Sequence, residues 1–227
     1  MHETRIEVNG EELLLEAAGA LWWPGEATLV FADLHFEKGS SYARGGQMLP
    51  PYDTRATLSR IETVVRRRAP ARVIALGDSF HDRYAADRLD EEERTRLANL
   101  GQGLEWIWIA GNHDPAPPSW LDGRIAEEIA IGGLVFRHEP SASRAPGEIA
   151  GHLHPCKSIT RRGRSLRRRC FVSDAMRLVM PAFGAYAGGL NVCHPAIGGL
   201  FGVPTFTVHM LGAQRLYAIS AERCLPD

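Results

Sequence analysis

The sequence lacks the features that mark several classes of protein. It has 26 basic and 27 acidic side chains, so its net charge of −1 is not that of a highly basic nucleic-acid-binding protein. Its few cysteines are widely spaced, which excludes a C-x-x-C zinc or redox pair and makes a disulfide scaffold implausible. They are Cys156, Cys170, Cys193 and Cys224. No apolar run reaches the roughly 18 residues of a membrane span. The N-terminus also lacks the basic start and apolar middle of a signal peptide. We therefore expect a cytoplasmic protein with reduced thiols.

Charge is unevenly distributed along this near-neutral chain. Six arginines lie between residues 161 and 169, namely Arg161, Arg162, Arg164, Arg167, Arg168 and Arg169. This cluster would suit the phosphate backbone of a nucleic acid. It would equally suit a solvated hairpin with Gly163 at its turn. A second cluster, Arg66 to Arg68, favours the C-terminal end of a helix. With 227 residues and 44% hydrophobic composition, we expect a single domain over residues 1–227.

The first half of the chain alternates between strand and helix patterns. Residues 27–35, 71–78 and 104–114 are short apolar runs that end in polar residues, which predicts buried strands. Between the first two, a helix is expected to begin at Asp53 as its N-cap, with apolar positions on one face. Residues 87–101 predict a second helix. This order indicates βαβ units and a parallel sheet. Trp106 and Trp108 alternate within the third run, so we expect them in the core.

After residue 123 the pattern changes to short strand candidates joined by glycine, proline and serine. They predict a mixed sheet, or a second sheet packed on the first. Residues 183–202 are rich in glycine and predict a long loop. His194 and His209 are expected to be structural.

Polar residues suited to metal binding follow five of the apolar runs. They are Asp33 and His35 in "DLH", Asp78, His81 and Asp82 in "GDSFHD", Asn112, His113 and Asp114 in "GNHD", His138 in "FRHEP", and His152 and His154 in "GHLHP". In open α/β sheets, ligand sites gather at the carboxyl ends of strands. Imidazole with carboxylate suits zinc, manganese or iron, and the number of donors exceeds what one tetrahedral ion needs. A carboxylate such as Asp78 would bridge two ions. In an extended segment, His152 and His154 would face the same side.

These motifs, in this order, resemble the signature of the calcineurin-like metallophosphoesterases. The resemblance implies an α/β (α+β-like) sandwich of two mixed β-sheets flanked by helices, with the metal site at the carboxyl ends of strands. It implies Asp33, His35 and His154 on one metal ion, Asn112, His138 and His152 on the other, and Asp78 as the bridge. It also implies His113 as the histidine that contacts the phosphate or protonates the leaving group, oriented by Asp114. Manganese is the expected metal, with zinc or iron as alternatives. The "GDSFHD" motif lacks the Arg-Gly that follows in phosphoprotein phosphatases.

Longer stretches around these motifs resemble the ligase-associated DNA damage response phosphoesterases of the PdeM type. This resemblance implies a repair-linked nuclease or phosphodiesterase, with DNA as a partner and a repair helicase or ligase as possible neighbours. Substrate contacts are expected from Arg44, His81, Asp82, Arg167 and Arg168. His81 and Asp82 are alternatively partners that orient the metal ligands, or a hydrogen-bonded loop pair. The oligomeric state stays open.

Two other functions remain compatible with the sequence. The near-neutral charge would also suit a phosphodiesterase or phosphatase acting on a small or cyclic nucleotide. A scaffold without catalytic activity is the third alternative, because some proteins related to metallophosphoesterases have lost ligands. Every ligand position is filled here, which favours an enzyme.

Overall fold

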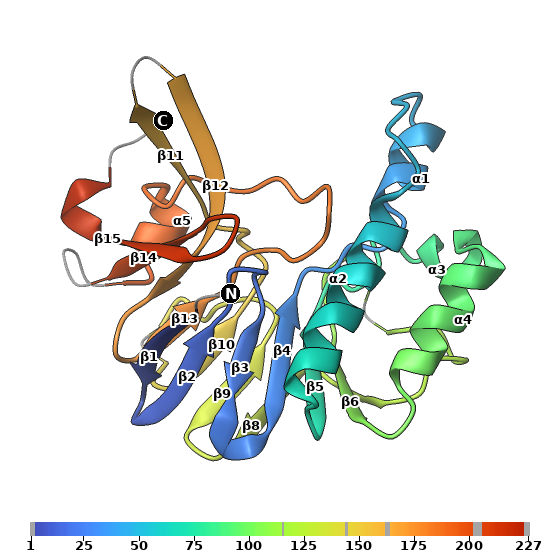
Figure 1. Cartoon of the computed structure of the whole chain (residues 1–227), viewed down its shortest axis with the longest axis horizontal. Helices are drawn as coiled ribbons and strands as arrows, with labels where there is room; N and C mark the ends of the chain where they lie inside the picture. The colour runs from blue at the N-terminus through green and yellow to red at the C-terminus, as the bar shows by residue number, and fades with distance from the viewer. Residues whose placement is uncertain (1–2, 115, 144, 162–163, 202–205, 225–227) are drawn as a thin grey trace.

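The computed structural model of the chain contains two mixed β-sheets packed face to face, with helices along the outer side of the first sheet (Figure 1). The structure describes residues 3–114, 116–143, 145–161, 164–201 and 206–224. Within these residues, no helix has the length and apolar character that crossing a membrane requires.

The first sheet joins an antiparallel edge to a parallel centre. Its strands, in spatial order, are β1 (Thr4–Val8), β2 (Glu11–Leu15), β3 (Leu21–Trp23), β4 (Thr28–Ala32), β5 (Arg72–Leu76), β6 (Glu105–Ile109) and β7 (Arg124–Ala126). A turn of 3₁₀ helix, η1 (Pro24–Glu26), precedes β4. Strands β4, β5 and β6 pair in parallel, which confirms the predicted βαβ order. The antiparallel strands β1 to β3 were not predicted from the sequence.

The second sheet contains the short strands expected after residue 123. In spatial order they are β15 (Leu216–Ser220), β14 (Thr207–Leu211), β12 (Arg164–Ser173), β13 (Arg177–Val179), β10 (Glu148–Ala150), β9 (Leu134–Arg137) and β8 (Glu128–Ile131). Strand β11 (Cys156–Arg161) forms an antiparallel hairpin with β12 that projects beyond the sheets in Figure 1. The predicted turn residue Gly163 lies outside the described residues. The expectation of two mixed sheets is confirmed.

The helices differ from the sequence prediction at their ends. They are α1 (Lys38–Arg44), α2 (Asp53–Arg68), α3 (Ala85–Arg88), α4 (Glu91–Leu100), α5 (Pro195–Gly198) and the 3₁₀ turn η2 (Ala221–Arg223). Asp53 is not the N-cap of α2: Tyr52 holds that position, and the Asp53 carboxylate accepts the backbone N–H of Gly39 at 3.0 Å. The expected helix at 87–101 begins later, because Asp90 caps α4 by accepting the N–H of Glu93. The glycine-rich stretch contains α5, whose N-cap is His194.

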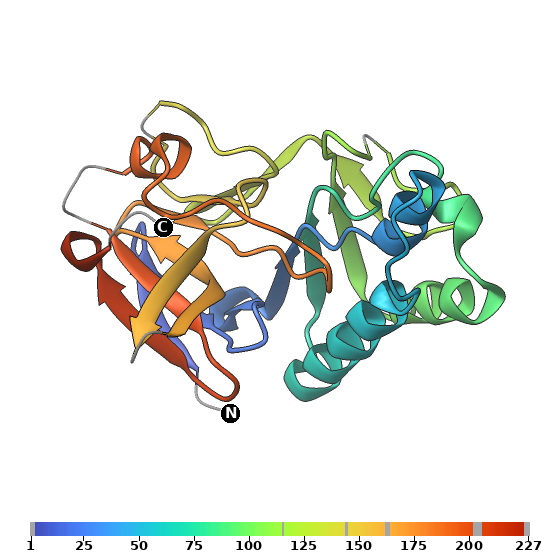
Figure 2. The same ribbon diagram turned by 90° about the horizontal axis from the view of Figure 1, so that it is seen from above.

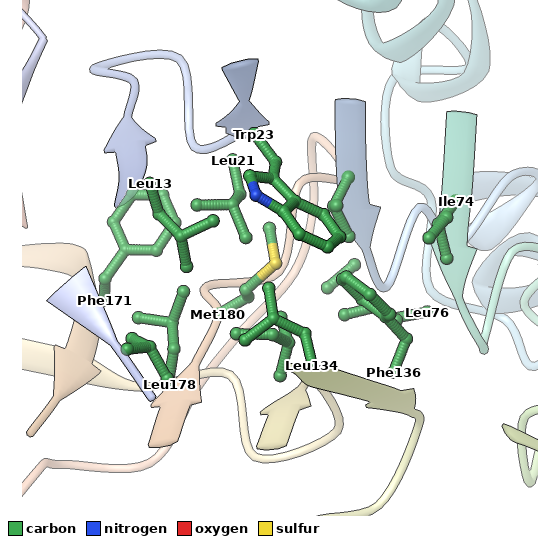
Figure 3. Packing of buried hydrophobic residues seen from close by; sticks show 14 of the residues in the cluster. Leu13, Leu21, Trp23, Ile74, Leu76, Leu134, Phe136, Phe171, Leu178 and Met180 are labelled. Carbon is green, nitrogen blue, oxygen red and sulfur yellow. The ribbon is translucent and has the colours of Figure 1, made fainter. Parts of the chain in front are cut away.

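The parallel strands divide their side chains between two hydrophobic layers. Alternate residues of each strand, such as Val30 and Ile74, belong to the hydrophobic cluster between the two sheets. Figure 3 shows part of this cluster, with Ile74 and Leu76 from β5 and Phe136 from β9. The residues between them point toward the helices, as Phe31 does. This period of two is the consequence of strand geometry, in which successive side chains take opposite faces. The central strands are therefore buried on both faces.

The layer between the first sheet and the helices contains the two tryptophans of β6. The rings of Trp106 and Trp108 stack with centroids 4.8 Å apart, and their indole N–H groups donate to the backbone carbonyls of Leu100 and Asp122. The prediction that they belong to the core is confirmed. A third layer covers the outer side of the second sheet and includes Val192 and Ile197 from the segment around α5. Figure 2 shows the connection after β13 extending from the second sheet toward α2.

Candidate metal centre

The predicted metal ligands come from five separate strand ends, and the fold brings them to one place. The loops after β4, β5 and β6 supply them from the first sheet, and those after β9 and β10 from the second. They are Asp33, His35, Asp78, Asn112, His138, His152 and His154. The carboxyl ends of parallel strands meet at one edge of a sheet, which places these loops together.

One group of donors contains Asp33, His35 and His154, whose ligand atoms all lie within 4.8 Å of one another. Nε2 of His154 lies 3.2 Å from Oδ1 of Asp33 and 3.2 Å from Nε2 of His35. Two ligands bound about 2.1 Å from the same ion are about 3.0–3.4 Å apart at tetrahedral or octahedral angles. The spacing of the group therefore fits a divalent metal ion.

The second group contains Asp78, His138 and His152, with Asn112 beside them. Nε2 of His138 lies 2.9 Å from Oδ1 of Asn112 and 3.1 Å from Nδ1 of His152. The other ring nitrogen of His138, Nδ1, lies 2.9 Å from the carbonyl of Leu76, which accepts only a donated proton. In a neutral ring Nε2 then carries a lone pair that faces the Asn112 oxygen. Converging lone pairs of this kind suit a cation.

A single carboxylate oxygen lies between the two groups. Oδ2 of Asp78 is 4.0 Å from Nε2 of His35 in the first group and 3.5 Å from Nε2 of His138 in the second. The Asp78 side chain is almost fully buried, and its other oxygen, Oδ1, accepts the backbone N–H of His113 at 2.9 Å. This leaves Oδ2 directed at both groups, which is the position the sequence assigned to a bridging ligand.

The backbone at the ligands is unusual. Left-handed φ angles occur at Asp33, His35, Asp78, His152 and His154, at 52°, 46°, 47°, 65° and 46°. Such conformations cost about 1 kcal/mol or more at residues with a β-carbon and persist at sites where the surroundings impose them. The extended segment predicted for His152 and His154 is therefore wrong. β10 ends at Ala150, and a left-handed loop, rather than strand alternation, directs the two rings to different groups.

Glycines directly before two ligands make room for this packing. A β-carbon on Gly111, which precedes Asn112, would lie 2.2 Å from the backbone nitrogen of Asp78. Gly77 has a φ of 67°, and a β-carbon there would lie 2.5 Å from the ring of His138. Both glycines lie within the motifs "GDSFHD" and "GNHD", where their role is not evident from the sequence. The pairing of glycine with ligand in "GD" and "GN" was the signal available.

Burial favours the neutral form of two of these imidazoles. Desolvation is the main cause that lowers the pKa of His35 to about 2, and the neighbouring His154 and Lys38 lower it further. Desolvation, followed by the nearby His138, also lowers the pKa of His152. Neutral imidazole is the form that binds metal ions. At neutral pH these rings offer lone pairs without first releasing a proton.

His113 lies at the rim of the two groups, with 40% of its side chain exposed. Its Nε2 lies 3.9 Å from Oδ2 of Asp78, and its Nδ1 lies 2.8 Å from the backbone carbonyl of His81. The carbonyl fixes the proton on Nδ1, so Nε2 is the atom presented to the centre. The ring of His81 stacks against His113 with centroids 5.2 Å apart. Burial is the main cause that lowers the pKa of His81 to about 4.

The role that the family resemblance implies for Asp114, the orientation of His113, belongs to another group in this structure. The group that orients His113 is the His81 carbonyl, whereas Oδ2 of Asp114 accepts the backbone N–H of Phe80 at 2.8 Å. Asp114 is buried, and desolvation is the main cause that raises its pKa to about 8. A buried carboxyl with backbone donors holds the loop that carries Asp78, so it positions that ligand rather than His113.

Comparison with known families identifies this arrangement. Residues 27–172, well over half of the chain, match the calcineurin-like phosphoesterases. The chain belongs to the calcineurin-like phosphoesterase family. A comparison with curated protein sequences gives no match.

Solved structures of phosphoesterases resemble this member of the family to different degrees. The crystal structure of Pseudomonas putida nuclease MPE has a TM-score of 0.73 and 27% sequence identity, and the match covers 96% of this chain and all of that one. YfcE, a phosphoesterase from E. coli, has a TM-score of 0.40 and 12% identity, over 86% of this chain and 98% of that one.

The donor set also fits the metal dependence of a calcineurin-like phosphoesterase. Two groups of carboxylate and imidazole, with an amide oxygen beside one of them, suit two divalent transition-metal ions. The protein is therefore a metal-dependent phosphoesterase.

The residues expected to contact substrate do not gather at one place, as the candidate metal ligands do. Arg44 is exposed at the end of α1. Asp82 is engaged with Arg88, whose two terminal nitrogens donate to its carboxylate at 3.0 and 2.8 Å. This ion pair lowers the pKa of Asp82 and holds its carboxylate against Arg88. Arg167 and Arg168 are exposed on β12, outside the two donor groups.

Proposed function

We propose that this protein is a nuclease that hydrolyses phosphodiester bonds in nucleic acid, with DNA as the favoured substrate. One observation carries the proposal: the single oxygen Oδ2 of Asp78 lies between two complete groups of metal donors. Paired ions roughly 3.5 to 4 Å apart neutralise a phosphate and activate water as a nucleophile in phosphatases and nucleases.

The chain's own residues divide the work around such a pair. Asp33, His35 and His154 would hold one ion, Asn112, His138 and His152 the other, with Asp78 between them. His113 would contact the phosphate from the rim. In its imidazolium form it would carry a second proton on the exposed Nε2 and give that proton to the departing oxygen, which leaves the neutral ring. Its Nδ1–H stays on the His81 carbonyl throughout, which keeps the ring in one orientation. Proton transfer by a positioned side chain typically contributes about 10²- to 10⁴-fold.

Two further observations favour nucleic acid over a small phosphoester. The neighbour with 27% identity over nearly the whole chain is described as a nuclease. The exposed Arg167 and Arg168 also give the projecting β11–β12 hairpin donors for backbone phosphates. The ligase-associated resemblance of the sequence leads us to propose a role in DNA repair, near a ligase or helicase.

A substrate panel tests the proposal. Purified protein loaded with manganese, zinc, iron or magnesium is offered single-stranded DNA, duplex DNA, RNA and cyclic nucleotides. We expect cleavage of DNA by the parent and by Asp122→Asn, an exposed control, and loss of cleavage in Asp78→Asn. Hydrolysis of cyclic nucleotides without any cleavage of DNA or RNA would replace the proposed substrate with a small nucleotide. Unchanged hydrolysis in Asp78→Asn would overturn the metal-dependent mechanism.

A further inference from the structure

A cavity lined by arginines lies on the far side of a chain segment that contacts the metal centre. Its volume is about 490 Å³, and its charged lining residues are Arg60, Arg167, Arg168 and Arg169. The remaining lining residues are apolar and mostly small, and none is acidic. The volume lies within the range of ligand sites in proteins. We call this site the arginine cavity.

Two of these arginines are held in place by backbone carbonyls. Nη1 of Arg60 donates to the carbonyl of Phe183 at 2.8 Å, and Nη2 donates to that of Ala18 at 2.7 Å. Nη1 of Arg169 donates to the carbonyls of residues 182, 183 and 184. The two guanidinium groups thus share the Phe183 oxygen. These contacts fix the direction of both cations before any ligand binds.

Within the described part of the chain, the charges of Arg60 and Arg169 are not offset by a carboxylate. Among the residues that the structure describes, no acidic side chain lies within ion-pair distance of Arg60, Arg168 or Arg169. Burial, and secondly the charge of Arg169, lower the pKa of Arg60 to about 10. Burial also lowers the pKa of Arg169. Placing two like charges together in a poorly solvated site is unfavourable, and an anion between them would remove that cost.

Donors remain available for an anion. A guanidinium has five N–H groups, and the hydrogen bonds of Arg169 to carbonyls use only Nη1. Nε and Nη2 of Arg169 make no hydrogen bond within the described part of the chain, and neither is sealed from solvent. Arg168 adds an exposed guanidinium at the same cavity. Planar guanidinium forks match the oxygens of phosphate in bidentate geometry.

The arginine cavity is joined to the metal centre through the backbone. The N–H of Gly184 donates to the carbonyl of Asp33 at 3.1 Å, while the Gly184 carbonyl accepts from Arg169 at 2.8 Å. One residue therefore contacts a metal ligand on one side and the cavity on the other. A nucleic-acid strand carries a phosphate for each site, whereas a small phosphoester carries only one.

We propose that the arginine cavity binds a phosphate group. That this phosphate belongs to the substrate strand, away from the bond that is cleaved, rests on the proposed nuclease function. The bound phosphate could alternatively come from free phosphate or from a mononucleotide. Two independent measurements distinguish these from a phosphate of the substrate strand.

The first measurement asks whether the cavity binds a tetrahedral anion. The thermal midpoint of the metal-loaded protein is followed as sulfate is added at constant ionic strength. The variants are Arg168→Gln, Arg60→Lys, and the control Arg124→Gln, which removes an exposed arginine from β7. We expect the same rise in the parent and Arg124→Gln, and a smaller rise in the two cavity variants. Arg60→Lys keeps a positive charge, so a reduced rise there reports the lost guanidinium geometry.

The second measurement asks whether the anion is part of the substrate strand. DNA binding is measured between low and moderate salt, and kcat/KM is compared for an oligonucleotide and for bis(p-nitrophenyl) phosphate. One lost phosphate contact lowers the salt slope by about 0.7 on single strands or about 0.9 on duplex DNA. We expect that decrease in Arg168→Gln, together with a several-fold fall in the ratio of oligonucleotide to small-diester kcat/KM. Arg124→Gln should keep both values.

The results separate the two claims. If Arg168→Gln and Arg60→Lys match Arg124→Gln in the sulfate titration and in the DNA measurements, the cavity is not a phosphate site. If sulfate stabilisation is reduced but the salt slope is unchanged, the phosphate is free or part of a mononucleotide, and the strand assignment is overturned. If the parent cleaves only small diesters, the proposed nuclease function fails, while the sulfate titration still decides whether the cavity binds an anion.

Discussion

The candidate metal centre and the arginine cavity lie on two sides of residues 182–184 and have opposite electrostatic character. The metal centre gathers carboxylate oxygens and imidazole lone pairs, and the arginine cavity gathers N–H donors. Left-handed loops at strand ends hold the acceptors, whereas backbone carbonyls hold the donors. The acceptors of the metal centre favour a cation as ligand, and the donors of the arginine cavity favour an anion. The difference shows that this phosphoesterase has two kinds of polar site, which separate experiments can disrupt independently.

The largest effect that should distinguish the two sites is on turnover. Replacing His113 with alanine removes the rim imidazole but retains the backbone N–H that donates to Asp78. We expect kcat to fall about 10²- to 10⁴-fold with metal content unchanged. Steady-state kinetics on an oligonucleotide and metal analysis test this, with the exposed His194→Ala as control. A variant that keeps full activity would remove His113 from the mechanism.

Metal removal should affect the two sites unequally. An ion held at about 1,000 times its dissociation constant contributes about 4 kcal/mol to the free energy of unfolding. Chelation should remove this contribution and lower hydrogen-exchange protection at the ligand loops near Asp33 and His152. Protection of β12 and β14 should change little. An equal loss of hydrogen-exchange protection in both regions would mean that the structure around the arginine cavity also depends on the metal ions.

Acid should weaken the second sheet without involving the metals. His209 of β14 is buried, and desolvation lowers its pKa from 6.5 to about 4. Between these values the unfolded chain binds the proton more readily than the folded one, so stability falls as pH drops from about 7 to 4. The fall should reach about 3 kcal/mol. The free energy of unfolding of the parent and of His209→Gln is measured against pH with denaturant. If it falls equally with pH in both proteins, His209 is not the cause of the acid sensitivity.

The smallest difference is expected within the arginine cavity itself. Arg169→Gln removes the donor to the carbonyls of Ala182 and Gly184, while the Phe183 carbonyl keeps Arg60, and the change should cost about 1–3 kcal/mol of unfolding free energy. Arg168→Gln, at an exposed site, should stay within about 0.5 kcal/mol. Urea unfolding of both variants provides the comparison. Equal losses would mean that Arg168 also supports the fold and is less useful as a probe of binding.

The candidate metal ligands could be picked out from the sequence because each is local to a strand end. "DLH", "GDSFHD", "GNHD" and "GHLHP" follow apolar runs, and parallel strands bring such ends together. The left-handed backbone at His152 and His154 could not be predicted from the sequence. Glycine is the residue that usually indicates a left-handed conformation, and neither position is a glycine. The orienting carbonyl of His81 was also missed, because a backbone atom has no identity in the sequence.

The arginine cavity was harder to predict because its parts are far apart in the chain. Arg60 lies on α2 and Arg169 on β12, and they meet only at the carbonyl of Phe183. The cluster at residues 161–169 drew attention to Arg167 and Arg168 but gave no reason to include Arg60. Strands β1 to β3 were missed for a related reason. They complete the first sheet by antiparallel pairing, and their short segments carry no motif.

Metal content is the most direct test of a binuclear centre. We expect two transition-metal ions per chain in the purified parent and in Asp122→Asn, measured by inductively coupled plasma mass spectrometry after dialysis. Asp78→Asn, which removes the charge between the two donor groups, should retain no more than one. Fewer than one ion per chain in the parent, or two ions retained in Asp78→Asn, would contradict a binuclear centre bridged by Asp78.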